Sequence, residues 1–159
     1  MIQDEYRRLI NSGEFKKWKL KHKNSYLSSC VLINEIGTKE LWHFDFYIPK
    51  TNKITTFVVD DNIIINEDQK IFEQTRKKLK EVNLDKIKFT LDRVNDILDK
   101  EFKDLKVLKK IIILQDINTM LWNVSLLGID FNLHNVKIDV KNGKILDKSA
   151  TSMLQFKAS

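Results

Sequence analysis

The sequence contains two similar alternating stretches, Leu41-Trp42-His43-Phe44-Asp45-Phe46 and, about 80 residues later, Leu121-Trp122-Asn123-Val124-Ser125-Leu126. In both stretches apolar residues recur at every second position, which is typical of a β-strand with one buried face. A strand-like apolar run precedes each of them, Cys30-Val31-Leu32-Ile33 in the first case and Ile111-Ile112-Ile113-Leu114 in the second. The sequence therefore contains one small pattern twice, which indicates two copies of a module packed together.

A helical pattern precedes each pair of predicted strands. Residues 2–21 predict a helix that is interrupted at Ser12-Gly13, where Ser12 is a suitable N-cap for the second piece. In the second half Thr90 is the expected N-cap of a helix with an apolar stripe, formed by Leu91, Val94, Ile97, Leu98 and Phe102.

A third strand is expected to close each unit, at residues 54–59 and 131–140. Residues 63–65 can form a further short strand, and Asn142-Gly143 marks a tight turn. Each unit is then a helix followed by three antiparallel strands, which is an α+β arrangement.

These elements predict a first repeat over residues 1–62, a connector over 63–86 and a second repeat over 87–159. A unit of this size buries little apolar area by itself. We therefore expect the two repeats to share a core or to continue one sheet, as one fused globular unit.

The composition favours a cytoplasmic location. The chain has 159 residues with four glycines and one proline, so no long flexible segment is expected. No apolar run reaches the length of a membrane-spanning helix, and residues 1–5 do not resemble the start of a secretory signal. The single cysteine, Cys30, cannot form an internal disulfide.

The net charge of +6 comes almost entirely from lysine, and it invites a nucleic-acid hypothesis. The densest basic cluster consists of Lys16, Lys17, Trp18, Lys19, Lys21 and Lys23. Lysines neutralise phosphate groups and an aromatic ring can stack on a base, so the cluster is a candidate nucleic-acid-binding site. The same pattern also suits an anionic membrane surface. Alternatively, Trp18 faces the core together with Phe15 and the lysines are only solvated.

The sequence contains few candidates for catalytic or metal-binding residues. His43 and Asp45 share one face of a predicted strand, where polar residues are expected for solvation alone. Cys30 lies in an apolar strand, which favours a buried, inert thiol. The histidines have no spacing typical of a metal site, and no phosphate-binding or nucleophile motif occurs. We therefore expect no enzyme activity, no metal and no cofactor.

One resemblance adds to this interpretation. The pattern Trp122-Asn123-Val124, followed by Ile138-Asp139-Val140 and Asn142-Gly143-Lys144-Ile145, is similar to the PepSY domain over about residues 87–147. Trp42-His43-Phe44 gives the first half the same outline, although its turn lacks the glycine. The whole chain resembles uncharacterised tandem PepSY-like proteins of archaea.

The resemblance implies two cystatin-like repeats, each with a helix packed on a small antiparallel sheet, and no catalytic residues. It favours a non-enzymatic module that binds a protein or peptide, with edge-strand addition as one mode. The alternative is a nucleic-acid-binding protein that uses the lysine-rich N-terminal helix. The partner and the oligomeric state are left open by the sequence.

Overall fold

The computed structural model describes residues 1–70 and 78–154. Its helices are α1 (Ile2–Ile10), α2 (Gly13–Lys21), α3 (Leu91–Glu101) and the short 3-10 helix η1 (Leu84–Lys86). The predicted interruption of the first helix is confirmed, and the Ser12 hydroxyl accepts a hydrogen bond from the Phe15 amide at 3.2 Å. In the same way, the Thr90 hydroxyl caps α3 by accepting a hydrogen bond from the Arg93 amide at 3.5 Å.

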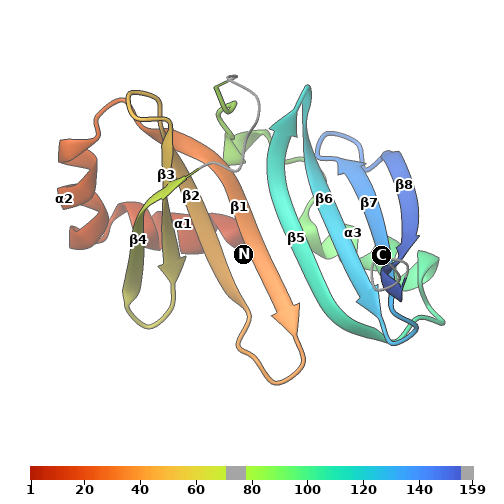
Figure 1. Cartoon of the computed structure of the whole chain (residues 1–159). Coiled ribbons are helices and arrows are strands. Elements are labelled where there is room, and N and C mark those ends of the chain that lie inside the picture. Colours follow the sequence, from red (N-terminus) through yellow and green to blue (C-terminus); the bar gives the residue numbers. More distant parts are fainter. Residues whose placement is uncertain (71–77, 155–159) are drawn as a thin grey trace.

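All the strands belong to one antiparallel sheet, in the order β4-β3-β2-β1-β5-β6-β7-β8 (Figure 1). Their bounds are β1 (Tyr26–Glu35), β2 (Leu41–Ile48), β3 (Lys53–Val59), β4 (Ile63–Lys70), β5 (Val107–Ile117), β6 (Thr119–Gly128), β7 (Asn132–Asp139) and β8 (Ile145–Ser152). The α+β class is therefore confirmed. The two halves of the chain meet where β1 pairs with β5, so a single sheet runs through both.

Within residues 1–70 and 78–154, each half has four strands rather than the three expected. The additional strands are β4, of which only residues 63–65 were predicted, and β8, which occupies part of the expected C-terminal tail. Both lie at the edges of the sheet. Since β8 is exposed along nearly its whole length, its sequence carries no apolar alternation that would reveal it.

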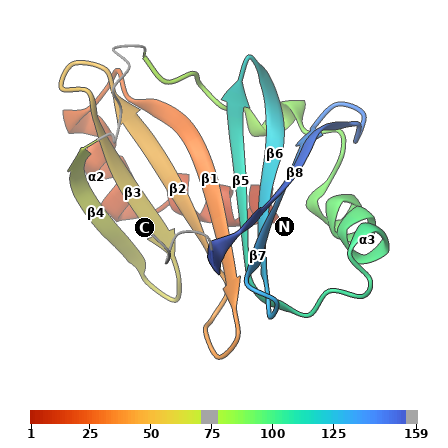
Figure 2. The same cartoon turned by 45° about the vertical axis from the view of Figure 1, so that its right-hand side comes forward.

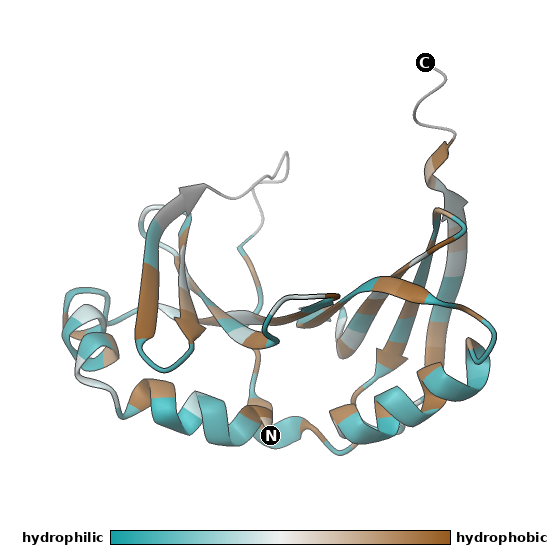
Figure 3. Cartoon of the chain, turned by 90° about the horizontal axis from the view of Figure 1, so that it is seen from below, coloured by the Kyte–Doolittle hydropathy of each residue, from teal (hydrophilic) through white to brown (hydrophobic). Residues whose placement is uncertain are grey.

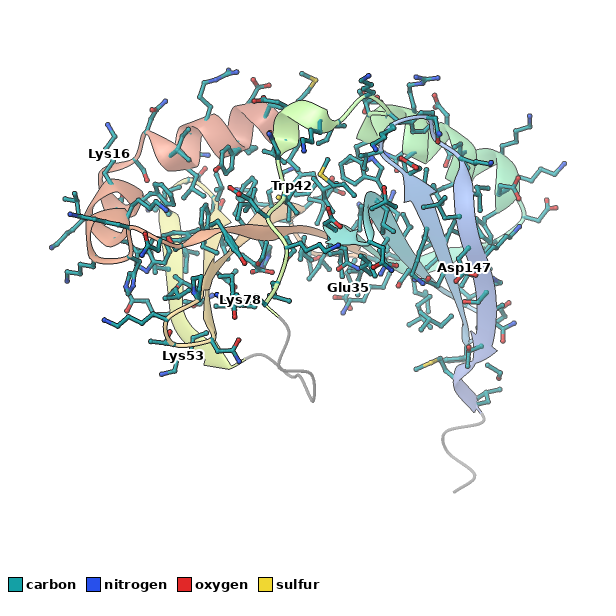
Figure 4. All side chains as sticks on the ribbon, turned by 90° about the horizontal axis from the view of Figure 1, so that it is seen from above. Lys16, Glu35, Trp42, Lys53, Lys78 and Asp147 are labelled. Carbon is teal, nitrogen blue, oxygen red and sulfur yellow. The ribbon has the colours of Figure 1, made fainter. Side chains whose placement is uncertain are left out.

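In the part of the chain that the structure describes, the helices lie on one side of the sheet (Figure 3). Helices α1 and α2 accompany the β1–β4 half (Figure 1), and α3 accompanies the β5–β8 half (Figure 2). The core between helices and sheet contains the inward residues of every predicted alternating strand, including Trp42, Phe44, Trp122 and Val124. Trp42 lies between the helix layer and the sheet (Figure 4), and the Trp122 indole donates to the Phe89 carbonyl at 2.9 Å.

The described part of the connector is tied to both halves. The Val82 amide donates to the Leu27 carbonyl of β1 at 2.8 Å. The Lys80 ammonium group forms an ion pair with the Asp116 carboxylate of β5 at 3.8 Å. Val82 and Leu84 are buried in the common core, so this segment contributes to folding.

Candidate functional site

The face of the sheet opposite the helices has an apolar centre. Val31 and Ile33 of β1, with Ile111 and Ile113 of β5, point away from the helix-side core and are half-buried. The strand register places Val31 opposite Ile113 and Ile33 opposite Ile111. We refer to these four residues as the central patch. The outer strands on both sides rise beyond it, away from the helices (Figure 3).

The central patch departs from the usual pattern of a sheet with one solvated face. Such a sheet normally alternates apolar inward residues with polar outward ones. In β1 and β5 the inward residues Leu32 and Ile112 are buried, yet the outward neighbours are aliphatic as well. Strands that are apolar on both faces are typical of sheets covered on both sides.

A polar cluster on β1, β2 and β3 borders the central patch. The two carboxylate oxygens of Asp45 accept hydrogen bonds from the Ser29 hydroxyl at 2.7 Å and the Thr56 hydroxyl at 2.5 Å. His43 lies two residues away on the same strand face, opposite Val31. Partial burial lowers the pKa of the His43 imidazole, and the charge of Asp45 acts in the opposite direction.

A second polar cluster borders the patch on β6 and β7. The Asn135 amide group donates to the Asn123 side-chain oxygen at 2.7 Å and to the Ser125 hydroxyl at 3.1 Å. The Lys137 ammonium donates to the Asn135 side-chain oxygen at 3.2 Å and pairs with Asp147 of β8 at 3.4 Å. Both clusters thus combine a half-buried position with satisfied hydrogen bonds.

This face offers no evident catalytic pair. Asp45 uses its carboxylate to accept from two hydroxyl groups, and no hydrogen bond joins it to His43 among the described residues. In that part of the chain there is also no group of three His, Cys, Asp or Glu side chains suited to a metal ion. Cys30 is fully buried, and desolvation together with the Asp45 charge raises the pKa of its thiol well above the ordinary value.

A hollow on the helix side lies between α1 and residues 81–86. It has a volume of about 670 Å³ and is bordered by charges of both signs, from Arg7 and Lys86 and from Glu81 and Asp85. Tyr6 also lines it, and burial raises the pKa of this phenol. None of the lining residues is a cysteine, serine, threonine or histidine. The hollow therefore contains no serine–histidine or cysteine–histidine pair.

The predicted lysine cluster lies on α2 and directly after it. Lys16, Lys17, Lys21 and Lys23 are exposed, and Lys16 is on the outer side of the helix (Figure 4). Lys19 is half-buried, and desolvation lowers the pKa of its ammonium group, which donates to the Ser25 hydroxyl at 3.1 Å.

Trp18 is separated from these lysines by the packing of α2. It is only 3% exposed, and its ring centroid lies 5.0 Å from that of Phe57 and 5.7 Å from that of Phe46. Phe15 contacts the same two rings. Trp18 is thus part of the core and has no free face on which a base could stack. The assignment of the lysines to nucleic acid stays a prediction.

No protein-family model matches the chain, and no curated protein matches it. The fold is similar to that of a crystal structure from Clostridium difficile 630, a protein described as a "putative lipoprotein", with a TM-score of 0.58. The two sequences are 16% identical over 87% of this chain and 90% of that chain. At this identity the similarity concerns the fold alone. The PepSY resemblance stays a prediction.

None of the helices in the described ranges is both long and apolar enough to cross a bilayer.

The sequence did not reveal the central patch, because the run Ile111-Ile112-Ile113-Leu114 does not show which side chains face the helices. Its continuous apolar character was nevertheless a signal, since strands covered on both faces have this composition.

Proposed function

We propose that the protein is a non-enzymatic module that binds a protein or peptide through the central patch. The observation that carries this proposal is the aliphatic character of both faces of β1 and β5, with helices on one side only. A partner that covers the patch would remove half-buried aliphatic surface from water, which is a favourable contribution to binding.

The partner that fits this face has aliphatic side chains at its centre and hydrogen-bonding groups beside them. The polar clusters around Asp45 and Asn135 lie on the two flanks of the patch and can orient such a segment. Edge-strand addition is a different mode, and β4 and β8 are the two edge strands at which it would occur.

The test is selection of binders from a phage-displayed random peptide library, followed by affinity measurement with synthetic peptides. Substituting Ile113→Lys should weaken binding by at least about tenfold, since a charge enters the centre of the interface. The matched control is Ser149→Lys, which adds the same side chain to the same face on the outer strand β8. Bound peptides should be recovered intact by mass spectrometry.

Selected peptides whose affinity is the same for Ile113→Lys and the wild type would contradict binding at the patch. Methylating alternate backbone nitrogens of a peptide distinguishes the two modes. Loss of binding on methylation, with no effect of Ile113→Lys, would assign the peptide to an edge of the sheet, at β4 or β8.

We also propose that the chain is built from two PepSY-like repeats of cystatin-like fold. Two tryptophans support an equivalence between the halves. Trp42 of β2 lies opposite Leu32 of β1, and Trp122 of β6 lies opposite Leu114 of β5. Leu32 and Leu114 therefore hold corresponding places in their halves.

The pairing of β1 with β5 agrees with this equivalence. The residues just before these leucines, Val31 and Ile113, correspond as well, and they are paired with each other across the sheet. Two corresponding residues that face each other lie on a two-fold axis. The symmetric strand order around β1 and β5 is the second support.

We propose a cytoplasmic location for the protein, because its one cysteine is buried and unpaired. Fractionation of cells that produce the tagged chain tests this proposal. Recovery from an extracytoplasmic fraction would contradict it.

A further inference from the structure

The outer side of α2 carries an exposed leucine among lysines. Leu20 is 71% exposed, although Phe15 and Trp18 of the same helix are buried. Four exposed lysines surround it in the sequence, and Lys19 is half-buried beside it. We name this the α2 basic surface, and it consists of Lys16, Lys17, Lys19, Leu20, Lys21 and Lys23.

The Leu20 side chain borders an apolar hollow. A shallow hollow of about 480 Å³ lies beside it, with Ile10 and Phe15 as further apolar residues. Its other lining residues are Lys16, Lys19 and Lys23, so ammonium groups surround the aliphatic surface. Long lysine side chains can direct their charge to a polar layer while an aliphatic neighbour enters an apolar one.

The α2 basic surface is held in a fixed arrangement. The Ser12 cap fixes the start of α2, and the rings of Phe15 and Trp18 anchor the helix on Phe46 and Phe57. The bond from Lys19 to the Ser25 hydroxyl fixes its end. A surface that is already ordered loses less conformational entropy when it binds.

The position of α2 allows contact with a large flat partner. The helix lies at one extremity of the molecule, next to β4 and far from β8 (Figure 1). The central patch lies on the middle strands β1 and β5. A planar surface in contact with α2 therefore leaves the patch accessible.

We propose that the α2 basic surface docks on an anionic membrane surface, with its lysines at the lipid phosphates and Leu20 in the interfacial apolar layer. An exposed aliphatic side chain has a counterpart in a lipid bilayer but none along a phosphate backbone. Nucleic acid binding is less well matched, because Trp18 is buried and α2 contains no arginine to fork onto phosphate or guanine.

Co-sedimentation of the full chain with vesicles tests the proposal. One set contains only phosphatidylcholine and the other contains phosphatidylcholine with phosphatidylglycerol, at low and high salt. Binding should require the anionic lipid and weaken with salt. The double substitution Lys16→Glu and Lys23→Glu, at two exposed lysines that line the hollow, should lower binding by at least about 25-fold, from roughly fivefold for each lysine.

Two further variants make the test specific. Leu20→Ser leaves every charge in place and should still lower binding several-fold, which a purely electrostatic contact would not show. The matched control is Lys103→Glu with Lys106→Glu, the same charge change at exposed lysines after α3. We expect each variant to fold, because all the replaced side chains are exposed. Circular dichroism of each variant checks this.

The proposal is overturned if binding to the two vesicle sets is equal, or if the control variant loses as much binding as the α2 variant. It is also overturned if Leu20→Ser binds vesicles like the wild type. Salt-sensitive retention on a single-stranded oligonucleotide without vesicle binding would assign the lysines to nucleic acid instead.

Discussion

Gly143 occupies a place that excludes any side chain on two grounds. Its φ of +74° lies in the left-handed region, and an added Cβ would lie 2.2 Å from a ring carbon of Phe89. Phe89 is a core residue that also contacts the Trp122 indole through its carbonyl. The turn predicted from Asn142-Gly143 therefore also fixes how the segment before α3 packs on the sheet.

Replacing Gly143 with alanine should lower the free energy of unfolding by at least about 2 kcal/mol, since strain and a steric clash add. Chemical denaturation measures the change. Gly13→Ala is the matched control, because Gly13 has open space around it at the start of α2 and alanine favours helix. A Gly143→Ala variant as stable as the wild type would contradict the argument.

Single residues also show how far the site could be predicted. Exposed lysines and a core-facing Trp18 were among the alternatives that helical spacing left open, and the structure places Trp18 in the core. The apolar hollow beside Leu20 was not predictable, because Ile10 reaches it from the preceding helix. Contacts between separate helices depend on the angle at which the helices pack, and the spacing of residues in the sequence does not predict this angle.

Among the elements, α2 shows most directly how a local signal fixes a structure. Substituting Ser12→Ala removes the acceptor for the Phe15 amide and should lower the free energy of unfolding by about 1 kcal/mol. Ser12→Thr, which keeps a hydroxyl that can accept from the Phe15 amide and donate to the Leu9 carbonyl, should retain most of the stability. Thermal unfolding of the three proteins measures this order. Equal losses for both variants would show that the cap does not stabilise α2.

The predictable elements were those with a strong internal pattern. Both capped helices and the alternating strands β2 and β6 have such patterns, and the structure contains all of them. Strand β8 was missed because its residues are nearly all exposed. The run Ile111-Ile112-Ile113-Leu114 did not show which of its residues face the helices, because a shift of one residue exchanges the two faces of a strand.

At the scale of the whole molecule, the pairing of β1 with β5 determines whether either half is stable alone. Separate chains of residues 1–86 and 87–159 would each expose one of these strands, with aliphatic residues on both its faces. Chains of this size also bury a small fraction of their surface. We expect each fragment alone to be poorly folded or aggregated, and an equimolar mixture to regain the β-sheet signal.

Circular dichroism measures the β-sheet signal of each fragment and of their mixture, and analytical ultracentrifugation measures their association. The melting temperature of the mixture should rise with concentration, as for any bimolecular complex. A fragment that is monomeric and melts cooperatively at the temperature of the intact chain would show that its half does not need the other.

The covalent link across the β1–β5 junction makes the assembly of the sheet independent of dilution. If β1 and β5 belonged to two different chains, the chains would dissociate when their concentration fell below the dissociation constant. Because β1 and β5 are joined in one chain, they meet at a local concentration on the order of millimolar, whatever the number of copies in the cell. The complete sheet, and with it the patch centred on Val31 and Ile113, is then present even when the protein is scarce.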